Sequence, residues 1–239
     1  QYISSDRNFS VGDGQQEFLA LAGDDDFDDL LNGVDSALSV GFDWDLVDVQ
    51  GKGFETIGHR ERGWIFHSDD AFASNVGFTQ AYLSSRRNYL VGDRLKLLVR
   101  GEIGYTDADV REFSIDVDGA PFGLSVTTLP NFYRFKAGGS MSVRGYGFEQ
   151  LSDNDVGSNH IVTASVEGEY RFLDKWSAAL FFDIGNAFNE WDDPDLKRGA
   201  GIGIRWYSIA GAVRIDYAQA VDFEGRPWRL HITIGTPLL

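Results

Sequence analysis

Alternation between apolar and polar residues dominates this sequence, and it is clearest between residues 162 and 172. The apolar positions there are Val162, Ala164, Val166, Gly168, Tyr170 and Phe172. The intervening positions are polar or charged: Thr163, Ser165, Glu167, Glu169 and Arg171. A period of two predicts a β-strand that has one dry face and one wet face.

The same period recurs along most of the chain and predicts an all-β fold. It is repeated in residues 38–46, 95–100, 213–217 and 228–235. We predict about eleven strands, at residues 1–11, 15–22, 35–49, 63–73, 77–90, 94–106, 161–172, 176–187, 198–208, 211–220 and 227–236. Many of these span about 10 to 13 residues, which exceeds the usual strand length and approaches what a tilted strand needs to cross a bilayer.

The connections between these strands alternate in length. Short turns are expected at residues 12–14, 91–93, 173–175 and 208–211, and longer connections at 23–34, 107–159 and 187–197. Short turns on one rim and long loops on the other are typical of outer-membrane barrels. Because nothing at Gln1 resembles a strand that could close the sheet, we predict the C-terminal portion of an antiparallel transmembrane β-barrel. A soluble sandwich whose polar face meets bulk water is the alternative for any single strand.

Composition narrows the classes of function. The formal net charge of −16 over 239 residues argues against a nucleic-acid partner, because phosphate contacts need a basic face. The chain has no cysteine, and no window approaches the roughly 18 to 20 apolar residues of a membrane helix. No metal or cofactor is predicted, because the acidic run at 24–29 lacks the glycine and glutamate positions of a calcium loop. No Gly-x-Ser-x-Gly motif is present, and we expect no enzymatic activity.

The long segment 107–159 contains the most distinctive group of residues. A loop of this length without structure of its own is uncommon unless it has a function. We name four of its residues the loop latch: Val143, Arg144, Gly145 and Tyr146. If the loop folds into the barrel lumen, Arg144 can reach Asp183 and either Glu167 or Glu169, which alternation places on the inner face. A guanidinium suits this contact because its planar fork binds a carboxylate bidentately. The alternative is that Arg144 is a solvated arginine in a turn.

Several motifs together resemble one family. They are Leu129–Phe135 and the segment that follows to Tyr146, Ser165–Glu167, Phe181-x-Asp183-x-Gly185, Gly199–Trp206 and Val213–Tyr217. This set is similar to the barrel domain of the BamA/TamA outer-membrane assembly superfamily, also described as the bacterial surface antigen barrel domain. The details are more similar to TamA, and the resemblance extends from about Arg62 to Leu239.

The resemblance implies a barrel of about sixteen strands, so that about five N-terminal strands and the periplasmic POTRA domains would lie outside this chain. It makes Arg144 the loop arginine and Asp183 its main carboxylate partner. Glu167 matches the glutamate on the first strand after the loop, and Glu169 is the neighbouring alternative.

The last strand would face the barrel seam, with the residues Trp228, Leu230, Ile232, Ile234 and Gly235. The chain departs from the usual outer-membrane pattern here, because it ends in Leu239 without a terminal aromatic residue. Weak pairing of the first and last barrel strands would let exposed backbone groups template an incoming strand.

The implied function is a non-enzymatic outer-membrane component that helps insert or translocate other outer-membrane proteins or autotransporters. The expected partners are outer-membrane lipids, client β-barrel proteins or autotransporters, and a candidate partner that spans the periplasm. Two alternatives remain within the membrane, a dedicated secretion barrel and the anchor of a fused passenger enzyme. A third is a soluble acidic β-protein that binds a ligand.

Overall fold

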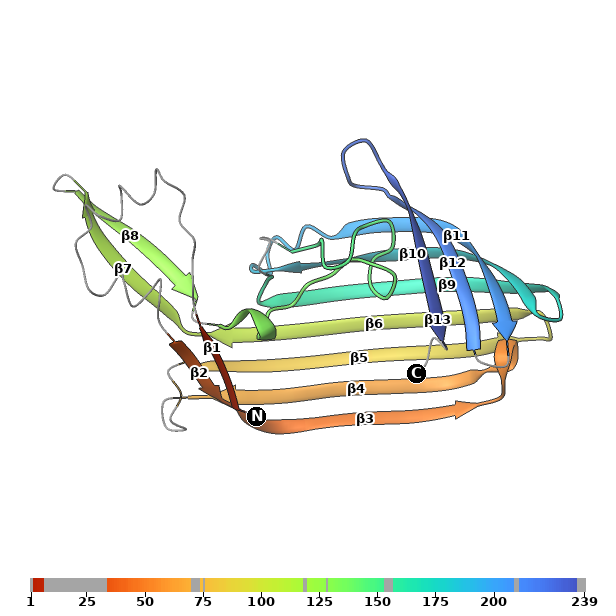
Figure 1. The fold of residues 1–239 in the computed structure, drawn as a ribbon, viewed down its shortest axis with the longest axis horizontal. Coiled ribbons are helices and arrows are strands. Elements are labelled where there is room, and N and C mark those ends of the chain that lie inside the picture. Colours follow the sequence, from red (N-terminus) through yellow and green to blue (C-terminus); the bar gives the residue numbers. More distant parts are fainter. Residues whose placement is uncertain are drawn as a thin grey trace. The chain divides into compact units, whose positions relative to one another are not determined.

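The computed structural model of the protein describes residues 2–6, 34–69, 74, 76–117, 120–127, 129–152, 157–208 and 211–235. Nine strands form its largest sheet: β3 (Val40–Gln50), β4 (Ile57–Ser68), β5 (Phe78–Val91), β6 (Leu95–Ala108), β9 (His160–Leu173), β10 (Trp176–Phe188), β11 (Lys197–Ser208), β12 (Gly211–Ala220) and β13 (Trp228–Gly235). All neighbours in this sheet are consecutive in the described chain except β6 and β9 (Figure 1). Strands β3 and β13 are its two edges, so the sheet is an open partial barrel.

The chain divides into two compact units. One comprises Gln1–Gly41, Phe66–Gln80 and Asp107–Tyr133. It contains two small sheets, β1 (Tyr2–Asp6) with β2 (Val34–Leu38), and β7 (Val110–Val117) with β8 (Ala120–Thr127). Its core joins Val76, Phe78, Leu129 and Tyr133. The other, which we call the barrel unit, comprises Phe42–Ile65, Ala81–Thr106 and Arg134–Leu239, and it contains all the candidate site residues described below.

Sequence alternation located the later strands well. The seven strands predicted between residues 77 and 236 match β5, β6 and β9–β13 to within two residues at each end. The strand predicted at 63–73 begins earlier, at Ile57, because the connection from β3 needs only residues 51–56, which contain the 3₁₀ helix η1 (Gly53–Glu55).

The early strand predictions need correction. The strand predicted at 35–49 is two strands that are separated at Ser39, because β2 pairs with β1 in a small sheet and β3 belongs to the nine-stranded sheet. Within the segment predicted at 1–11, the described residues Tyr2–Asp6 pair with β2 and not with the nine-stranded sheet. The strand predicted at 15–22, the turn at 12–14 and the acidic run at 24–29 lie outside the described residues.

The prediction that residues 107–159 lack structure of their own is wrong for the first half of that segment. Strand β6 continues to Ala108, and the antiparallel pair β7–β8 follows, with the 3₁₀ helix η3 (Asn131–Tyr133) after it. The signal was present in the sequence, because Phe113, Ile115 and Val117 alternate with polar residues ahead of an Asp-Gly dipeptide. Between η3 and β9, the described residues form two isolated backbone bridges, Phe135 with Ser158 and Ala137 with Leu151.

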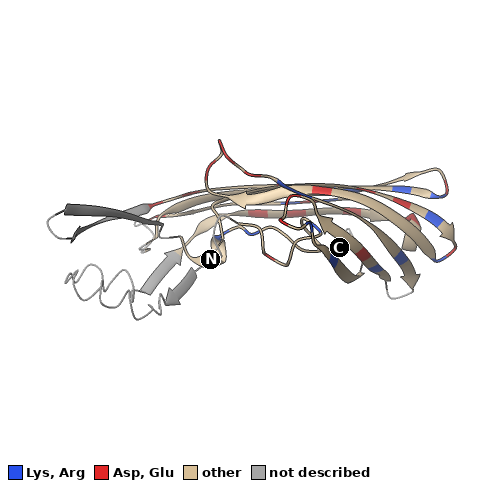
Figure 2. Ribbon diagram, turned by 90° about the horizontal axis from the view of Figure 1, so that it is seen from above, with Lys and Arg blue, Asp and Glu red and all other residues tan. Residues whose placement is uncertain are grey.

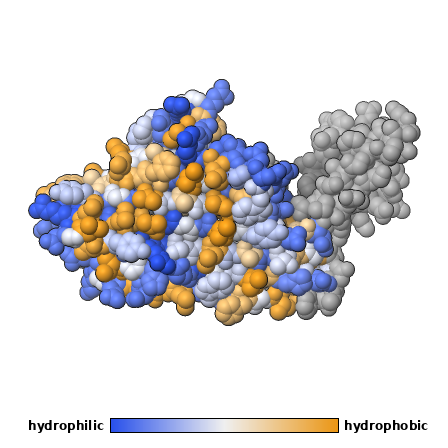
Figure 3. All heavy atoms as spheres, turned by 180° about the vertical axis from the view of Figure 1, so that it is seen from behind, coloured by the Kyte–Doolittle hydropathy of each residue, from blue (hydrophilic) through white to orange (hydrophobic). Residues whose placement is uncertain are grey.

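The exposure of apolar and polar side chains on the large sheet is the reverse of that in a soluble protein. On β10, Leu180 is 68% exposed and Phe182 is 46% exposed, whereas Phe181 and Asp183 are buried. The same holds on β13, where Ile232 is 61% exposed and His231 is buried. Figure 3 shows apolar side chains spread over the outer face, and Figure 2 shows charged positions of both signs along the strands and in the loop beside them. A soluble sandwich would bury the apolar set, so the sheet matches a wall that faces hydrocarbon.

Candidate functional site

The site is built on the inner face of the last five strands of the barrel unit. Antiparallel register places Ser165 of β9 opposite Asp183 of β10, and Asp183 opposite Gly199 of β11. Two residues further along β9, Glu167 lies opposite Phe181 of β10. Directly opposed residues point to the same face of a sheet, so these side chains form continuous rows across the wall.

Glycines on β11 leave room for the loop and for charged side chains. A Cβ atom at Gly199 would lie 1.9 Å from the carbonyl oxygen of Arg144, and one at Gly203 would lie 2.1 Å from Oδ1 of Asp216. A Cβ at Gly201 would lie 2.6 Å from the ring of Phe181. The alternating glycines therefore form a shallow strip of wall on which another backbone can lie closely.

Arg144 binds Asp183 through its backbone and its side chain. Its backbone N–H donates to Oδ2 of Asp183 at 3.0 Å, its Nε donates to the same oxygen at 2.8 Å, and its Nη2 donates to Oδ1 at 2.9 Å. The guanidinium also lies 3.4 Å from the ring centroid of Phe181. Both charged residues are buried, Arg144 at 2% exposure and Asp183 at 0%. This is the bidentate geometry that arginine makes with a carboxylate.

The same guanidinium reaches two further acids on the wall. Nη1 of Arg144 donates to Glu167 at 2.6 Å and to Asp216 at 3.4 Å. Glu167 also accepts hydrogen bonds from Arg205 and Arg214, each at 2.8 Å. Nη2 of Arg205 lies 2.7 Å from Asp216. The loop arginine thus joins a network that spans β9, β10, β11 and β12.

The loop latch also contacts the last three strands, through the backbone of Gly145 and the hydroxyl of Tyr146. Gly145 has a φ of +96°, and a Cβ there would lie 2.6 Å from the backbone carbon of Gln219 on β12. The Gly145 N–H donates to Nε2 of His231 on β13 at 3.0 Å. The Tyr146 hydroxyl donates to the carbonyl oxygen of Arg198 at 3.3 Å. A residue other than glycine would be strained at position 145 and would collide with β12.

Apolar packing completes the attachment of the loop. Loop residues Phe135, Ala137, Val143, Tyr146 and Leu151 pack with Ile161, Ala187 and Ala220 of the strands. Val143 is 0% exposed and Tyr146 is 1% exposed, so the latch is among the most buried parts of the described chain.

Electrostatics hold Arg144 in its charged form. Burial alone would lower the pKa of Arg144, but its hydrogen bonds to Asp183 and the charges of Asp183, Glu167 and Asp216 raise that pKa above its ordinary value. The arginine therefore stays positive at every pH at which the protein would be studied. Removing one partner of such a buried pair leaves the other uncompensated and costs about 3 to 5 kcal/mol.

The predicted site residues are distributed between two clusters. The structure brings Arg144, Asp183 and Glu167 together, whereas Glu169 has other partners. Its partners are Lys96 at 3.3 Å, Ser177 at 2.8 Å and Tyr207 at 2.6 Å, and Nε of Arg205 lies 3.9 Å from it, so Arg205 adjoins both clusters. The seam residues Trp228, Leu230, Ile232, Ile234 and Gly235 all lie on β13, the edge strand.

Sequence reasoning did not select Arg205, Asp216 or His231, although alternation places Asp216 and His231 on the polar face. Their contacts depend on the register between strands and on the path of the loop. No group of His, Asp and Glu that could hold a metal occurs in the part of the chain that the structure describes. Within those same residues, no helix is long and apolar enough to cross a membrane.

The comparison with protein families decides the identity of the fold. The Omp85 superfamily domain matches residues 21–237. This chain belongs to the Omp85 superfamily. The predicted BamA/TamA-type resemblance is confirmed, as are the partial antiparallel barrel and the outer-membrane location expected for an Omp85 protein. The finer likeness to TamA stays a prediction.

Two relatives of this Omp85 chain show how much of a longer protein it covers. The outer membrane protein assembly factor BamA of Nitratidesulfovibrio vulgaris (strain Hildenborough) is 33% identical over 116 residues, which cover 43% of this chain and 14% of the relative. The crystal structure of BamA from Haemophilus ducreyi lacking POTRA domains 1-3 matches with a TM-score of 0.59 at 17% identity. That match covers 84% of this chain and 42% of the other, so the chain spans less than half the length of either relative.

Proposed function

We propose that this Omp85 chain is the barrel part of an outer-membrane component that helps insert or translocate other outer-membrane proteins or autotransporters. Membership of the superfamily and homology with an assembly factor are consistent with a role in outer-membrane protein assembly. One observation supports the proposal most directly. Consecutive residues of one loop bind the wall and the edge strand, Arg144 through three acids on β9, β10 and β12, and Gly145 through His231 on β13.

In the proposed mechanism, the wall of the barrel stays rigid while the edge strand β13 moves. In the described part of the sheet, β13 pairs with β12 on one side, which leaves its other side to template an incoming strand. The loop latch would hold the inner wall in shape while this edge strand separates from its barrel partner. The clients would be β-barrel proteins or autotransporters, and no catalytic role is proposed for the acids of the wall.

Replacement of the latch arginine tests the proposal. We expect Arg144→Ala to leave the protein inserted in the outer membrane and to reduce the assembly of client barrels strongly, because Asp183 and Glu167 lose the cation that ties the loop to them. Client assembly is measured as the fraction of a client that reaches its folded, heat-modifiable form. Arg144→Lys should restore part of the function, since lysine keeps the charge without the fork.

A matched control uses an arginine outside the latch. Arg87 lies on β5, its side chain is 52% exposed, and it pairs with Glu61 at 2.7 Å. Arg87→Ala should leave client assembly unchanged. Normal client assembly by a folded Arg144→Ala protein would refute the latch.

A further inference from the structure

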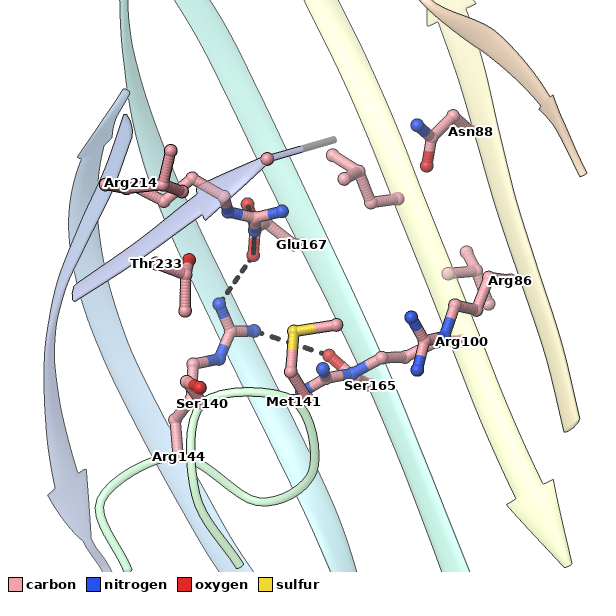
Figure 4. Close-up of a pocket in the computed structure, with 14 residues that line it drawn as sticks. Arg86, Asn88, Arg100, Ser140, Met141, Arg144, Ser165, Glu167, Arg214 and Thr233 are labelled. Carbon is pink, nitrogen blue, oxygen red and sulfur yellow. Dashed lines mark hydrogen bonds and ion pairs between the residues drawn. The ribbon is translucent and has the colours of Figure 1, made fainter. Parts of the chain in front are cut away.

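A small cavity lies beside the loop latch, inside the barrel unit. Its volume is about 150 Å³, and it is bounded by the loop and by strands β5, β6, β9, β12 and β13. Figure 4 shows Arg86 and Asn88, both from β5, on one side of the cavity, with Arg214 and Thr233 on the other. The residues Thr233, Ile234 and Gly235 of β13 also line it, so the cavity borders the proposed seam.

Arginines outnumber acids among the residues that line the cavity, although the whole chain carries a net charge of −16. Four arginines line it, Arg86, Arg100, Arg144 and Arg214, and Glu167 is the one acid among its lining residues. Arg144 and Arg214 are bound to Glu167, and Arg100 lies 3.6 Å from Asp183. No carboxylate of the described residues lies within ion-pair distance of Arg86. Among the described residues, the charge of Arg86 is therefore not paired with a carboxylate.

A second, independent observation points to a ligand. Asn88 is 4% exposed, and its Nδ2 has no hydrogen-bond partner among the described residues. Buried polar groups in native proteins are nearly always hydrogen-bonded, so an orphaned amide donor that lines a cavity calls for an acceptor within that cavity. Arg86 and Asn88 lie two residues apart on β5, and both line the cavity.

We propose that this cavity binds a carboxylate group of a polypeptide. The polypeptide would be the client chain, so this source of the ligand rests on the proposed function. Arg86 and Asn88 both line the cavity, so each offers a donor to a carboxylate bound within it. Glu167 on the same wall disfavours a dianion, and so disfavours a phosphate group. Leu98, Met141 and Ile234 also line the cavity and can contact the carbon chain that carries the carboxylate.

Titration calorimetry on the intact protein in detergent tests this inference. The first probe is the peptide Ac-Gly-Thr-Phe with a free carboxylate, and the second is the same peptide as its C-terminal amide. The third is the amide of Ac-Gly-Glu-Phe, whose carboxylate is in a side chain. We expect the first probe to bind and the second to bind at least tenfold more weakly, because a charge-assisted hydrogen bond is lost. The third should bind more tightly than the second, because its side chain restores a carboxylate.

Variants of the cavity separate a built site from general attraction. Arg86→Gln should weaken the first probe about tenfold or more, and Asn88→Asp, which keeps the shape but reverses the polarity, should weaken it further. Arg87→Gln is the matched control, because Arg87 is the next residue on β5 and pairs with Glu61 outside this cavity. Heat-modifiable migration establishes that each variant is folded.

Several results would overturn the inference. These are equal binding of the amide that lacks a carboxylate, unchanged binding by folded Arg86→Gln, and tighter binding of inorganic phosphate than of acetate. The titration contains no client barrel and measures no assembly. Failure of the proposed function would leave a measured carboxylate site in place, and failure of this site would leave the latch untouched.

Discussion

Glu167 and Glu169 lie two residues apart on the same face of β9, yet they belong to different kinds of cluster. Glu167 joins the loop arginine to Arg205 and Arg214 of the wall. The partners of Glu169 are all strand side chains, since Lys96 comes from β6, Ser177 from β10, and Tyr207 and the more distant Arg205 from β11. One cluster ties a loop to the wall, and the other ties strands to one another. Two acids with equal local patterning can therefore have different roles.

The largest effect is expected at the acid that binds the loop most extensively. Asp183→Asn keeps the shape of the side chain but leaves Arg144 and the nearby Arg100 without that negative charge. It should lower the free energy of unfolding by about 3 to 5 kcal/mol and expose the loop to trypsin at Lys136. Denaturant unfolding in lipid vesicles measures the first effect, and limited proteolysis measures the second.

The control for that experiment is Asp222→Asn. Asp222 pairs with Arg198, whose side chain is 52% exposed, so the change should cost about 0 to 1 kcal/mol and leave the loop protected. Equal costs for the two replacements would show that burial of the latch contributes nothing to stability.

An intermediate effect is expected where the loop backbone lies against the wall. Gly199→Ala would place a Cβ 1.9 Å from the carbonyl oxygen of Arg144, so the loop must shift. We expect a loss of about 1 to 3 kcal/mol in the same unfolding assay. Gly168→Ala on β9 is its counterpart, because a Cβ there meets nothing within 4 Å, and its effect should be small. If the two alanines behave alike, the close approach of the loop does not matter for stability.

The smallest effect is expected in the cluster between strands. Replacing both partners, Lys96→Met together with Glu169→Gln, removes the buried ion pair without leaving a lone charge, and the hydroxyl donors of Ser177 and Tyr207 keep an acceptor. The free energy of unfolding should change by about 1 kcal/mol or less, and the loop should stay resistant to trypsin. Release of the loop in this double variant would show that the two clusters act as one.

Local patterning predicted the face of the strand on which a side chain lies, where apolar and polar residues alternate. The exposure of Leu180 and Phe182 and the burial of Asp183 follow from a period of two, which each strand carries by itself. The β7–β8 pair was not predicted, although alternation is present in its sequence. Arg205 and Asp216 could not be paired in advance, because their contact depends on register and on the space left by Gly203.

The sequence by itself determined a set of long strands with an apolar outer face, a polar inner face and an arginine in a glycine-rich segment able to reach inner acids. Those features are local, since they follow from side-chain alternation and from the chemistry of single residues. The tertiary structure alone decided that Glu167 binds Arg144 while Glu169 binds Lys96, that His231 meets the loop, and that Arg86 and Asn88 border a cavity. These contacts join residues that are far apart in the chain, and only strand register and the path of the loop bring their atoms within bonding distance.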